Sequence, residues 1–250
     1  MSTDLPDDWR EQMTSMIAGM TPLDDAMFTG GPALSALEQI TVYRGQYKLR
    51  MYDAMIEELL GLEYLLGDDA REVLFRYLAA HPSQSWTLNR IADHIVDWLI
   101  EQGAPVEQIE MARVDRAVQS GFEATDGTPI TPDALANLPR IRLQPPVSLL
   151  HLSTNVHEIR GAALQDKDPP ELQFDKDVYL VIFRRDNRMR HWELSQGAWL
   201  VLQGLSEGKE LMEAITAVVE QGIVAPDALA DAVQGWFKDF AQHQLVEVVD

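Results

Sequence analysis

Residues 178–194 read VYLVIFRRDNRMRHWEL, and this stretch decides the fold of the C-terminal part of the chain. Two runs rich in β-branched and aromatic residues, 178–184 and 189–194, flank the polar segment 185–188. Such runs joined by Asp and Asn are typical of two antiparallel strands with a tight turn between them. The sequence therefore predicts a β-hairpin.

Three helices and a short strand are predicted after the hairpin. Ser195 is placed to cap the first helix, and a second periodic segment follows it. Pro226 opens the third helix, which carries Val233 and Phe237 on one side. The run LVEVV at 245–249 is β-rich and is able to return to the sheet. This β-β-α-α-α-β order predicts a small winged-helix-like domain over residues 171–250.

The N-terminal half has the periodicity of helices, with apolar residues recurring every three or four positions. We predict an all-helical bundle over residues 1–124 and an α+β fold for the whole chain. Residues 125–170 are predicted to be a linker with an extended segment at 141–160, because the stretch is rich in Pro, Gly and Asp. Two adjacent prolines limit that segment to an edge or a bulge.

Composition narrows the class of protein. The chain is 46% apolar, which is normal for a packed globule. It contains no run of ~20 apolar residues, and its start, MSTDLPDDWREQM, is acidic where a secretory signal is basic and then apolar. We therefore expect a cytoplasmic location and no membrane partner. With 40 acidic and 20 basic residues the net charge is −20, which argues against nucleic acid as a partner.

Signatures of catalysis and of cofactor binding are missing from the sequence. There is no Gly-rich phosphate loop, GxSxG elbow or HExxH motif, and the absence of cysteine excludes thiolate zinc sites and cysteine nucleophiles. The six histidines show no metal-ligand spacing. We therefore predict no catalytic residues, no metal and no cofactor, and we expect that the protein is not an enzyme.

Four arginines cluster around the predicted turn, namely Arg184, Arg185, Arg188 and Arg190. Three interpretations are open. The arginines could form a wing that enters DNA, or they could guard a solvated sheet edge against aggregation. The third interpretation is capture of an acidic peptide, in which a segment adds to the sheet as a strand while arginines pair with its carboxylates.

Three motifs in the N-terminal half match a known bacterial family. They are a tyrosine-arginine-x-x-tyrosine run (Tyr43, Arg44 and Tyr47), a leucine-leucine-glycine at 65–67, and Tyr77 followed by His-Pro-Ser at 81–83. On these motifs, residues 34–120 resemble the N-terminal region of a family catalogued as a DNA-binding domain. The chain departs from the family at residues 61–64, where tyrosine-proline is usual, and at Gly45, where asparagine is common.

Members of that family resemble partner proteins of multinuclear non-haem iron oxidases that modify ribosomally made peptides, including the methanobactin type. The resemblance implies that the oxidase carries the iron and that the partner protein holds the leader of the precursor peptide. It also implies that the helical domain docks the oxidase, with Tyr43, Arg44 and Tyr47 as the docking residues.

The C-terminal element order also resembles the peptide-recognition element of such pathways. In these elements the leader adds as a strand beside the hairpin and packs against the third helix. The expected peptide-binding residues are Arg188, Arg190, Trp192, Val233 and Phe237. The predicted function is a non-catalytic adaptor; the alternative is a DNA-binding transcriptional regulator that uses the hairpin from Arg184 to Arg190 as its wing. The adaptor hypothesis requires an unpaired strand edge on the hairpin, which residues near Val147 or Val248 would block if they paired there.

Overall fold

The computed structural model describes residues 9–19, 21–24, 28–83, 88–128 and 140–248. The protein is 57% helical and 11% strand, which confirms the predicted α+β class. It divides into two compact units, residues 1–112 and residues 113–250. Within the described ranges, no helix has the length and apolar character needed to cross a membrane.

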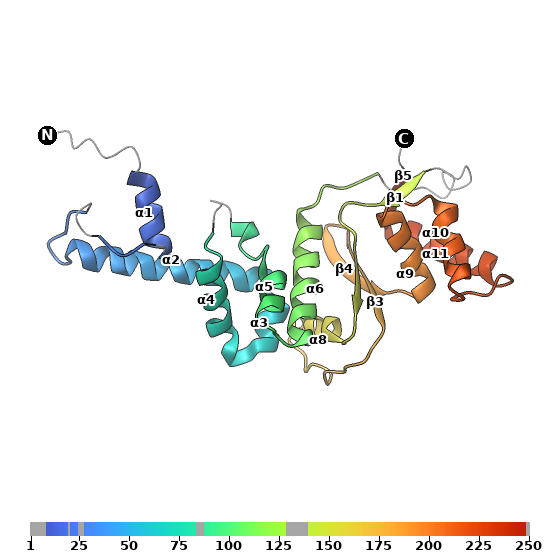
Figure 1. The fold of residues 1–250 in the computed structure, drawn as a ribbon, viewed down its shortest axis with the longest axis horizontal. Coiled ribbons are helices and arrows are strands. Elements are labelled where there is room, and N and C mark those ends of the chain that lie inside the picture. The colour runs from blue at the N-terminus through green and yellow to red at the C-terminus, as the bar shows by residue number, and fades with distance from the viewer. Residues whose placement is uncertain (1–8, 20, 25–27, 84–87, 129–139, 249–250) are drawn as a thin grey trace. The chain divides into compact units, whose positions relative to one another are not determined.

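The first unit is built from helices (Figure 1). These are α1 (Trp9–Ala18), α2 (Ala36–Glu58), α3 (Leu60–Leu66), α4 (Ala70–Ala80) and α5 (Ile95–Glu101), with 3-10 turns η1 (Gly67–Asp69) and η2 (Leu88–Arg90). Helix α6 (Val106–Glu123) begins in this unit and ends in the second. Every regular element described before residue 124 is thus helical, as the periodicity predicts.

Two sets of side-chain contacts stabilise the helices of the first unit. Ser35 caps α2, because its hydroxyl accepts the Glu38 N–H while the Glu38 carboxylate accepts the Ser35 N–H at 2.8 Å. At the centre of the unit, Tyr77 is fully buried and donates its hydroxyl to the Ile91 carbonyl at 2.9 Å. Its ring packs edge-on against Trp98. A buried tyrosine with a satisfied hydroxyl supplies both apolar area and a fixed polar contact.

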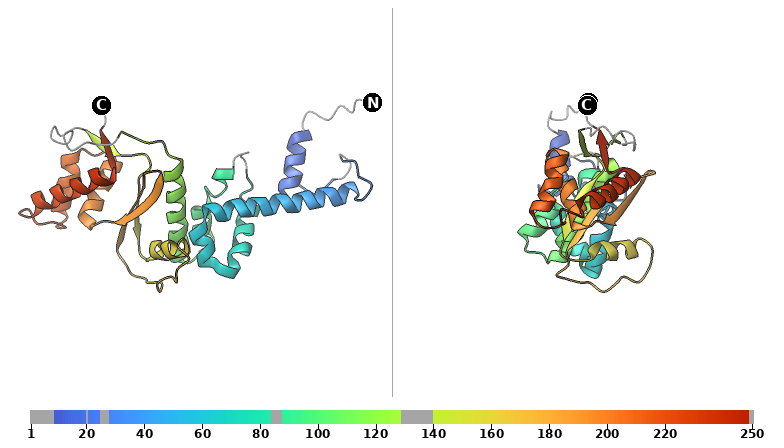
Figure 2. Two further views of the ribbon diagram at one scale, coloured as in Figure 1. Left: turned by 180° about the vertical axis from the view of Figure 1, so that it is seen from behind. Right: turned by 90° about the vertical axis from the view of Figure 1, so that its right-hand side faces the viewer.

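In its described residues, the second unit contains two sheets and, after α6, four helices (Figures 1 and 2). Its elements are β1 (Ile141–Leu143), β2 (Ser148–Leu152), α8 (Val156–Ala163), β3 (Val178–Arg185), β4 (Arg188–Glu193), α9 (Gln196–Ser206), α10 (Leu211–Glu220), α11 (Leu229–His243) and β5 (Val246–Val248). The three-stranded sheet has the order β2-β3-β4 and is antiparallel throughout. From residue 178 onward the element order is β-β-α-α-α-β, as predicted.

The predicted hairpin is present, with β3 and β4 joined by two residues. Asp186 and Asn187 form the turn with φ angles of 50° and 56°. Positive φ at both central residues is the type I′ geometry, which Asn and Asp tolerate and which matches the twist of the flanking strands. Ser195 caps α9, as expected, by accepting the Ala198 N–H at 3.3 Å.

Strand β3 is buried on both faces. Val181 and Phe183 lie in the apolar cluster formed with α9, α10 and α11. Leu180 and Ile182 point to the opposite face and are also fully buried. Figures 1 and 2 show α6 and α8 on that second face. Full burial of one such side chain stabilises the fold by roughly 1.5–3 kcal/mol, so this strand anchors the unit.

Two details of the region before the hairpin differ from the sequence prediction. The segment 141–160 is extended only at β1 and β2, and its last part lies in α8, so the prediction of extended structure there is wrong. The reason is that Val156 and Ile159 are buried together at helical spacing after Asn155, a signal too short to detect against the β-rich residues before it. Part of the predicted linker, residues 129–139, lies outside the described residues.

The C-terminal strand does not return to the three-stranded sheet. Instead, β5 pairs antiparallel with β1, with Arg142 opposite Glu247. Glu247 is buried. Its carboxylate accepts hydrogen bonds from Arg142 Nε at 2.6 Å and from the Thr128 N–H at 2.9 Å. This buried carboxylate ties the end of the chain to β1 and to the segment after α6.

A glycine in α6 allows that helix to approach the hairpin. A side chain at Gly121 would begin 2.4 Å from Met189 Cε and 2.9 Å from the Pro146 carbonyl oxygen. The methionine can move, but the backbone oxygen cannot. We expect Gly121→Val to lower the free energy of unfolding by about 1–3 kcal/mol in urea titrations. The matched control is Gly235→Ala in α11, where an added Cβ would meet no described atom within 4 Å apart from the local helix backbone. This substitution should stabilise the protein by roughly 0.5–1 kcal/mol.

Candidate functional site

In the part of the chain that the structure describes, strand β4 has a free edge. Among the described residues β4 pairs only with β3, whereas β3 is flanked on both sides. The expectation of an open edge is wrong for β3, because β2, which starts directly after Val147, occupies it. The strand that contains Val248 pairs elsewhere, with β1. The outer edge of β4 is therefore the place on the hairpin where a foreign strand can pair.

A groove of about 760 Å³ adjoins this edge. Residues of α6 and α8 line one side of it, the end of α11 lines the other, and hairpin residues lie between them. On the first side Leu164, just after α8, is 53% exposed, which is high for a leucine. On the other side the Trp192 and His243 rings lie 4.9 Å apart. The groove thus offers apolar surface and polar groups next to an unpaired backbone, as peptide-binding sites do.

Two of the four hairpin arginines are bound within the protein. The Arg184 guanidinium donates to the carbonyls of Gly121, Phe122 and Ala124 at 3.2, 2.5 and 2.6 Å, and it is nearly buried. Arg185 donates to the Gln242 carbonyl in the last turn of α11. Both cations therefore satisfy the carbonyl groups at helix C-termini, where positive charge is favoured.

The other two arginines, Arg188 and Arg190, are exposed on β4. Among the described residues, neither guanidinium has a hydrogen-bond or ion-pair partner. They are free to pair with a ligand's carboxylates. A DNA-entering wing would retain only these two of its four predicted cations for phosphate contacts, which weakens the alternative of a transcriptional regulator.

The five expected peptide-binding residues lie in two places. Arg190 and Trp192 line the groove, and Arg188 lies beside them at the start of β4. Val233 and Phe237 are half-buried on α11 against the core, and the Phe237 ring contacts Phe240 at 5.3 Å. They do not line the groove. The third helix reaches the groove instead through its last turn.

Sequence reasoning did not identify the other side of the groove. Arg160 and Gly161 on α8, and Leu164 after it, all line it. These residues precede the start of β4 at Arg188 by 24 to 28 positions in the chain, and no motif marks them. Only the pairing of β2 with β3, which places α8 beside the sheet, brings them to the site.

Both histidines of the groove have lowered pKa values. Burial, the neighbouring His157 and the cation of Arg160 lower the pKa of His191, while Glu193 opposes the shift. For His243 the causes are burial, then Arg185 and, more weakly, Arg190. Both rings are therefore expected to be neutral at pH 7, so the arginines supply the positive charge of the groove.

These lowered pKa values predict a pH dependence of stability. Since the unfolded chain takes up protons at His191 and His243 before the folded protein does, the free energy of unfolding should fall as pH decreases below about 6.5. Urea titrations between pH 7.5 and 5.5 measure this loss. The double variant His191→Gln/His243→Gln should lose less stability over the same range, and an equal loss in both proteins would contradict the assignment.

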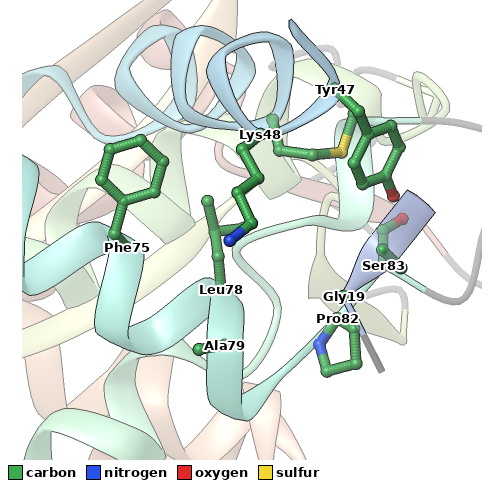
Figure 3. Close-up of a pocket in the computed structure, with 10 residues that line it drawn as sticks. Gly19, Tyr47, Lys48, Phe75, Leu78, Ala79, Pro82 and Ser83 are labelled. Atoms are coloured by element: carbon green, nitrogen blue, oxygen red, sulfur yellow. The ribbon is translucent and has the colours of Figure 1, made fainter. Parts of the chain in front are cut away.

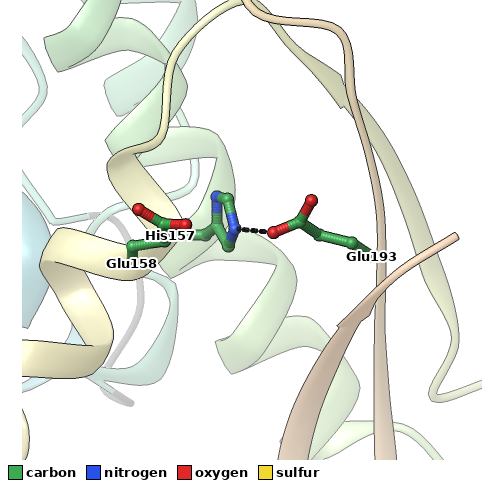
Figure 4. A group of neighbouring side chains, drawn as sticks. All are labelled: His157, Glu158 and Glu193. Atoms are coloured by element: carbon green, nitrogen blue, oxygen red, sulfur yellow. Dashed lines mark hydrogen bonds and ion pairs between the residues drawn. The ribbon is translucent and has the colours of Figure 1, made fainter. Parts of the chain in front are cut away.

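A third histidine joins α8 to β4. His157 is 3% exposed, and its Nε2 lies 3.0 Å from Glu193 Oε1 (Figure 4). Together with Glu158 these residues place three ligand-type atoms within 4.8 Å of one another. Glu158, however, accepts a hydrogen bond from Asn155 at 2.9 Å, and both carboxylates are exposed. We interpret the group as a polar link that holds α8 against the end of β4.

The expected docking residues of the first unit lie on α2. Tyr43 is 57% exposed, and the Arg44 guanidinium is directed at Gly19. Tyr47 lines a cavity of about 420 Å³ together with Lys48 and Phe75 (Figure 3). Burial raises the pKa of the Tyr47 hydroxyl. The trio therefore does not form one surface: one tyrosine faces solvent, and the other two residues face the helical bundle.

Comparison with known proteins adds no further assignment. A scan against protein-family models and a search of curated proteins both find no match to this chain. The resemblance of residues 34–120 to the oxidase-partner family therefore stays a prediction from the quoted motifs.

Proposed function

We propose that this chain is a non-catalytic adaptor, which binds the leader of a ribosomally made precursor peptide and presents it to a partner multinuclear non-haem iron oxidase. The observation that carries the proposal is the unpaired edge of β4 beside a groove of about 760 Å³. The leader pairs with this edge as a further strand, which gives affinity through main-chain hydrogen bonds. Residues 178–248 are arranged in this proposal as a winged-helix-like peptide-recognition element.

Charge favours a peptide with carboxylates in this groove. Arg188 and Arg190 are exposed on β4, while Arg184 and Arg185 are already bound to helix ends. An arginine pairs with a carboxylate through two parallel hydrogen bonds, which adds orientation to attraction. The same two residues are too few to supply the phosphate contacts of a DNA-binding wing.

The proposed oxidase-docking surface is on α2. Four apolar side chains of this helix, Leu37, Val42, Tyr43 and Leu49, are each more than 40% exposed. Val42 and Leu49 are seven positions apart and so lie on one side of the helix. Grouped exposed apolar residues are typical of protein–protein contacts. In the proposal the oxidase supplies the iron and the chemistry, and this chain supplies binding and orientation.

Two separable binding measurements test the proposal. The full chain is co-expressed with the iron oxidase encoded nearest to it, and retention on affinity resin is compared for wild type, Tyr43→Asp and the neighbouring surface control Gln46→Ala. Calorimetry with the precursor peptide encoded beside it gives the second measurement. We expect Tyr43→Asp to lose the oxidase and keep the peptide, and Arg190→Glu to do the opposite.

One outcome of these measurements would contradict the adaptor function. A chain that neither retains the oxidase nor binds the precursor at micromolar concentration does not have this function. A gel shift with duplex DNA at low salt, abolished by Arg188→Ala/Arg190→Ala, would favour the transcriptional regulator instead.

A further inference from the structure

The pattern of backbone hydrogen bonds between β3 and β4 determines which backbone groups of β4 face the groove. Leu194 donates its N–H to the Tyr179 carbonyl at 2.7 Å, so these two residues are a hydrogen-bonded pair. In an antiparallel ladder such pairs recur at every second residue. By the register of β3 and β4, Arg190 and Trp192 are therefore bonded to β3.

The intervening residues of β4 present their backbone to the free edge. Met189, His191 and Glu193 lie opposite Arg184, Ile182 and Leu180 in pairs that are not hydrogen-bonded. Their N–H and C=O groups point away from β3. Three donors and three acceptors thus face outward along five residues of strand, about 14 Å at the usual rise per residue.

Side chains also alternate along β4, so its two faces carry side chains of different chemical character. Arg188 and Arg190 lie on the face of Arg185 and Phe183, toward α11. Met189 lies on the other face, toward α6, where Leu164 is also exposed. One side of the groove therefore carries the two exposed cations. The other side offers Met189 and Leu164 as apolar surface, and Arg160, which also lines it, is already paired with Asp115.

We propose that the bound segment has acidic and apolar residues at alternating positions over about five to seven residues. This specificity rests on the proposed function of the groove. A strand added to β4 turns successive side chains to opposite faces. Its acidic side chains meet Arg188 and Arg190, and its apolar side chains meet Met189 and Leu164.

The net charge of the protein makes this pattern selective. A charge of −20 repels an acidic segment at long range, so only a segment whose carboxylates reach the two arginines gains from them. A uniformly acidic segment would place carboxylates near Glu193 and against apolar Leu164, where the neighbouring cation, Arg160, is already paired with Asp115. Alternation avoids both costs.

A selection experiment tests the inference with defined probes. A phage-displayed random decapeptide library is panned on the immobilised full chain, and the same library is panned on His191→Pro. Proline at 191 removes an outward N–H that bonds to no other described residue, and proline is tolerated at such edge positions. His191→Ala keeps the N–H and serves as the matched control. Met189→Pro removes a second outward N–H and replaces His191→Pro if that variant does not fold.

The outcomes separate the inference from the proposed function. We expect peptides enriched on wild type and His191→Ala but not on His191→Pro, with acidic residues at i and i+2 and an apolar residue between them. Enriched peptides that need the edge but lack this alternation overturn the inference and leave the peptide-binding function standing. If wild type enriches no peptides beyond those enriched on His191→Pro, both the inference and the peptide-binding function are overturned.

A charge reversal gives the second readout. Arg190→Glu should weaken the affinity for a selected peptide roughly tenfold, as measured by fluorescence anisotropy. A lysine in place of the peptide's acidic residue that faces position 190 should restore binding. Unchanged affinity in Arg190→Glu contradicts the proposed direction of the acidic side chains.

Discussion

Replacing Asp115 with alanine lowers the free energy of unfolding of the second unit by about 3–5 kcal/mol, the largest single-residue effect that we expect. Asp115 is completely buried, and its Oδ1 accepts Arg160 Nε at 2.6 Å. Arg160 is itself only 11% exposed. Removing the carboxylate leaves a nearly buried cation without this partner, so the cost exceeds the worth of one hydrogen bond.

The measurement must report on the second unit alone. Urea unfolding is followed by the indole N–H signals of Trp192, Trp199 and Trp236, which all belong to residues 113–250. The control is Glu210→Ala, which removes the exposed ion pair with Arg140 and should cost less than about 1 kcal/mol. Equal effects of the two substitutions would show that the buried pair does not hold α8 to α6.

Replacing Arg184 with alanine has the second largest expected effect, a loss of about 2–4 kcal/mol. Its guanidinium binds three carbonyls at the end of α6, and the side chain is 10% exposed. Alanine would remove this shared donor from the three carbonyls and a cation from a helix C-terminus. The exposed carboxylate of Asp126, 2.7 Å away, adds little because solvent screens it.

The matched control lies on the same hairpin. Arg188→Ala changes an exposed side chain that has no hydrogen-bond or ion-pair partner in the described part of the chain, and it should alter stability by no more than about 0.5 kcal/mol. The same urea titrations compare the two variants. If Arg188→Ala destabilises the protein as much as Arg184→Ala, the division of the hairpin arginines into structural and free pairs is wrong.

The parts of the fold that the sequence predicted are those with strong local signals. The hairpin follows from two β-rich runs around Asp186 and Asn187, and α9 begins at a serine cap, Ser195. Strand β2 and helix α8 lack such signals. Their places depend on long-range pairing of residues 148–152 with β3, which no local pattern encodes.

The candidate site divides in the same way. Arg190 and Trp192 were predicted because they lie on a recognisable strand, and they line the groove. Leu164 and His243 were missed, because a half-exposed leucine after a helix and a histidine in a last helical turn are common on protein surfaces. Whether Arg184 would be bound or free was equally hidden from the sequence, since its partners are about 60 positions away.

The central claim is that the outer edge of β4 is unpaired in the free protein, and amide hydrogen exchange measured by NMR tests it directly. Exchange should alternate along the strand: fast at Met189, His191 and Glu193, whose N–H groups face outward, and slow at Arg190 and Trp192, which are bonded to β3. If the first three amides exchange as slowly as the other two, the protein's own chain already covers the edge, and the adaptor loses its binding site.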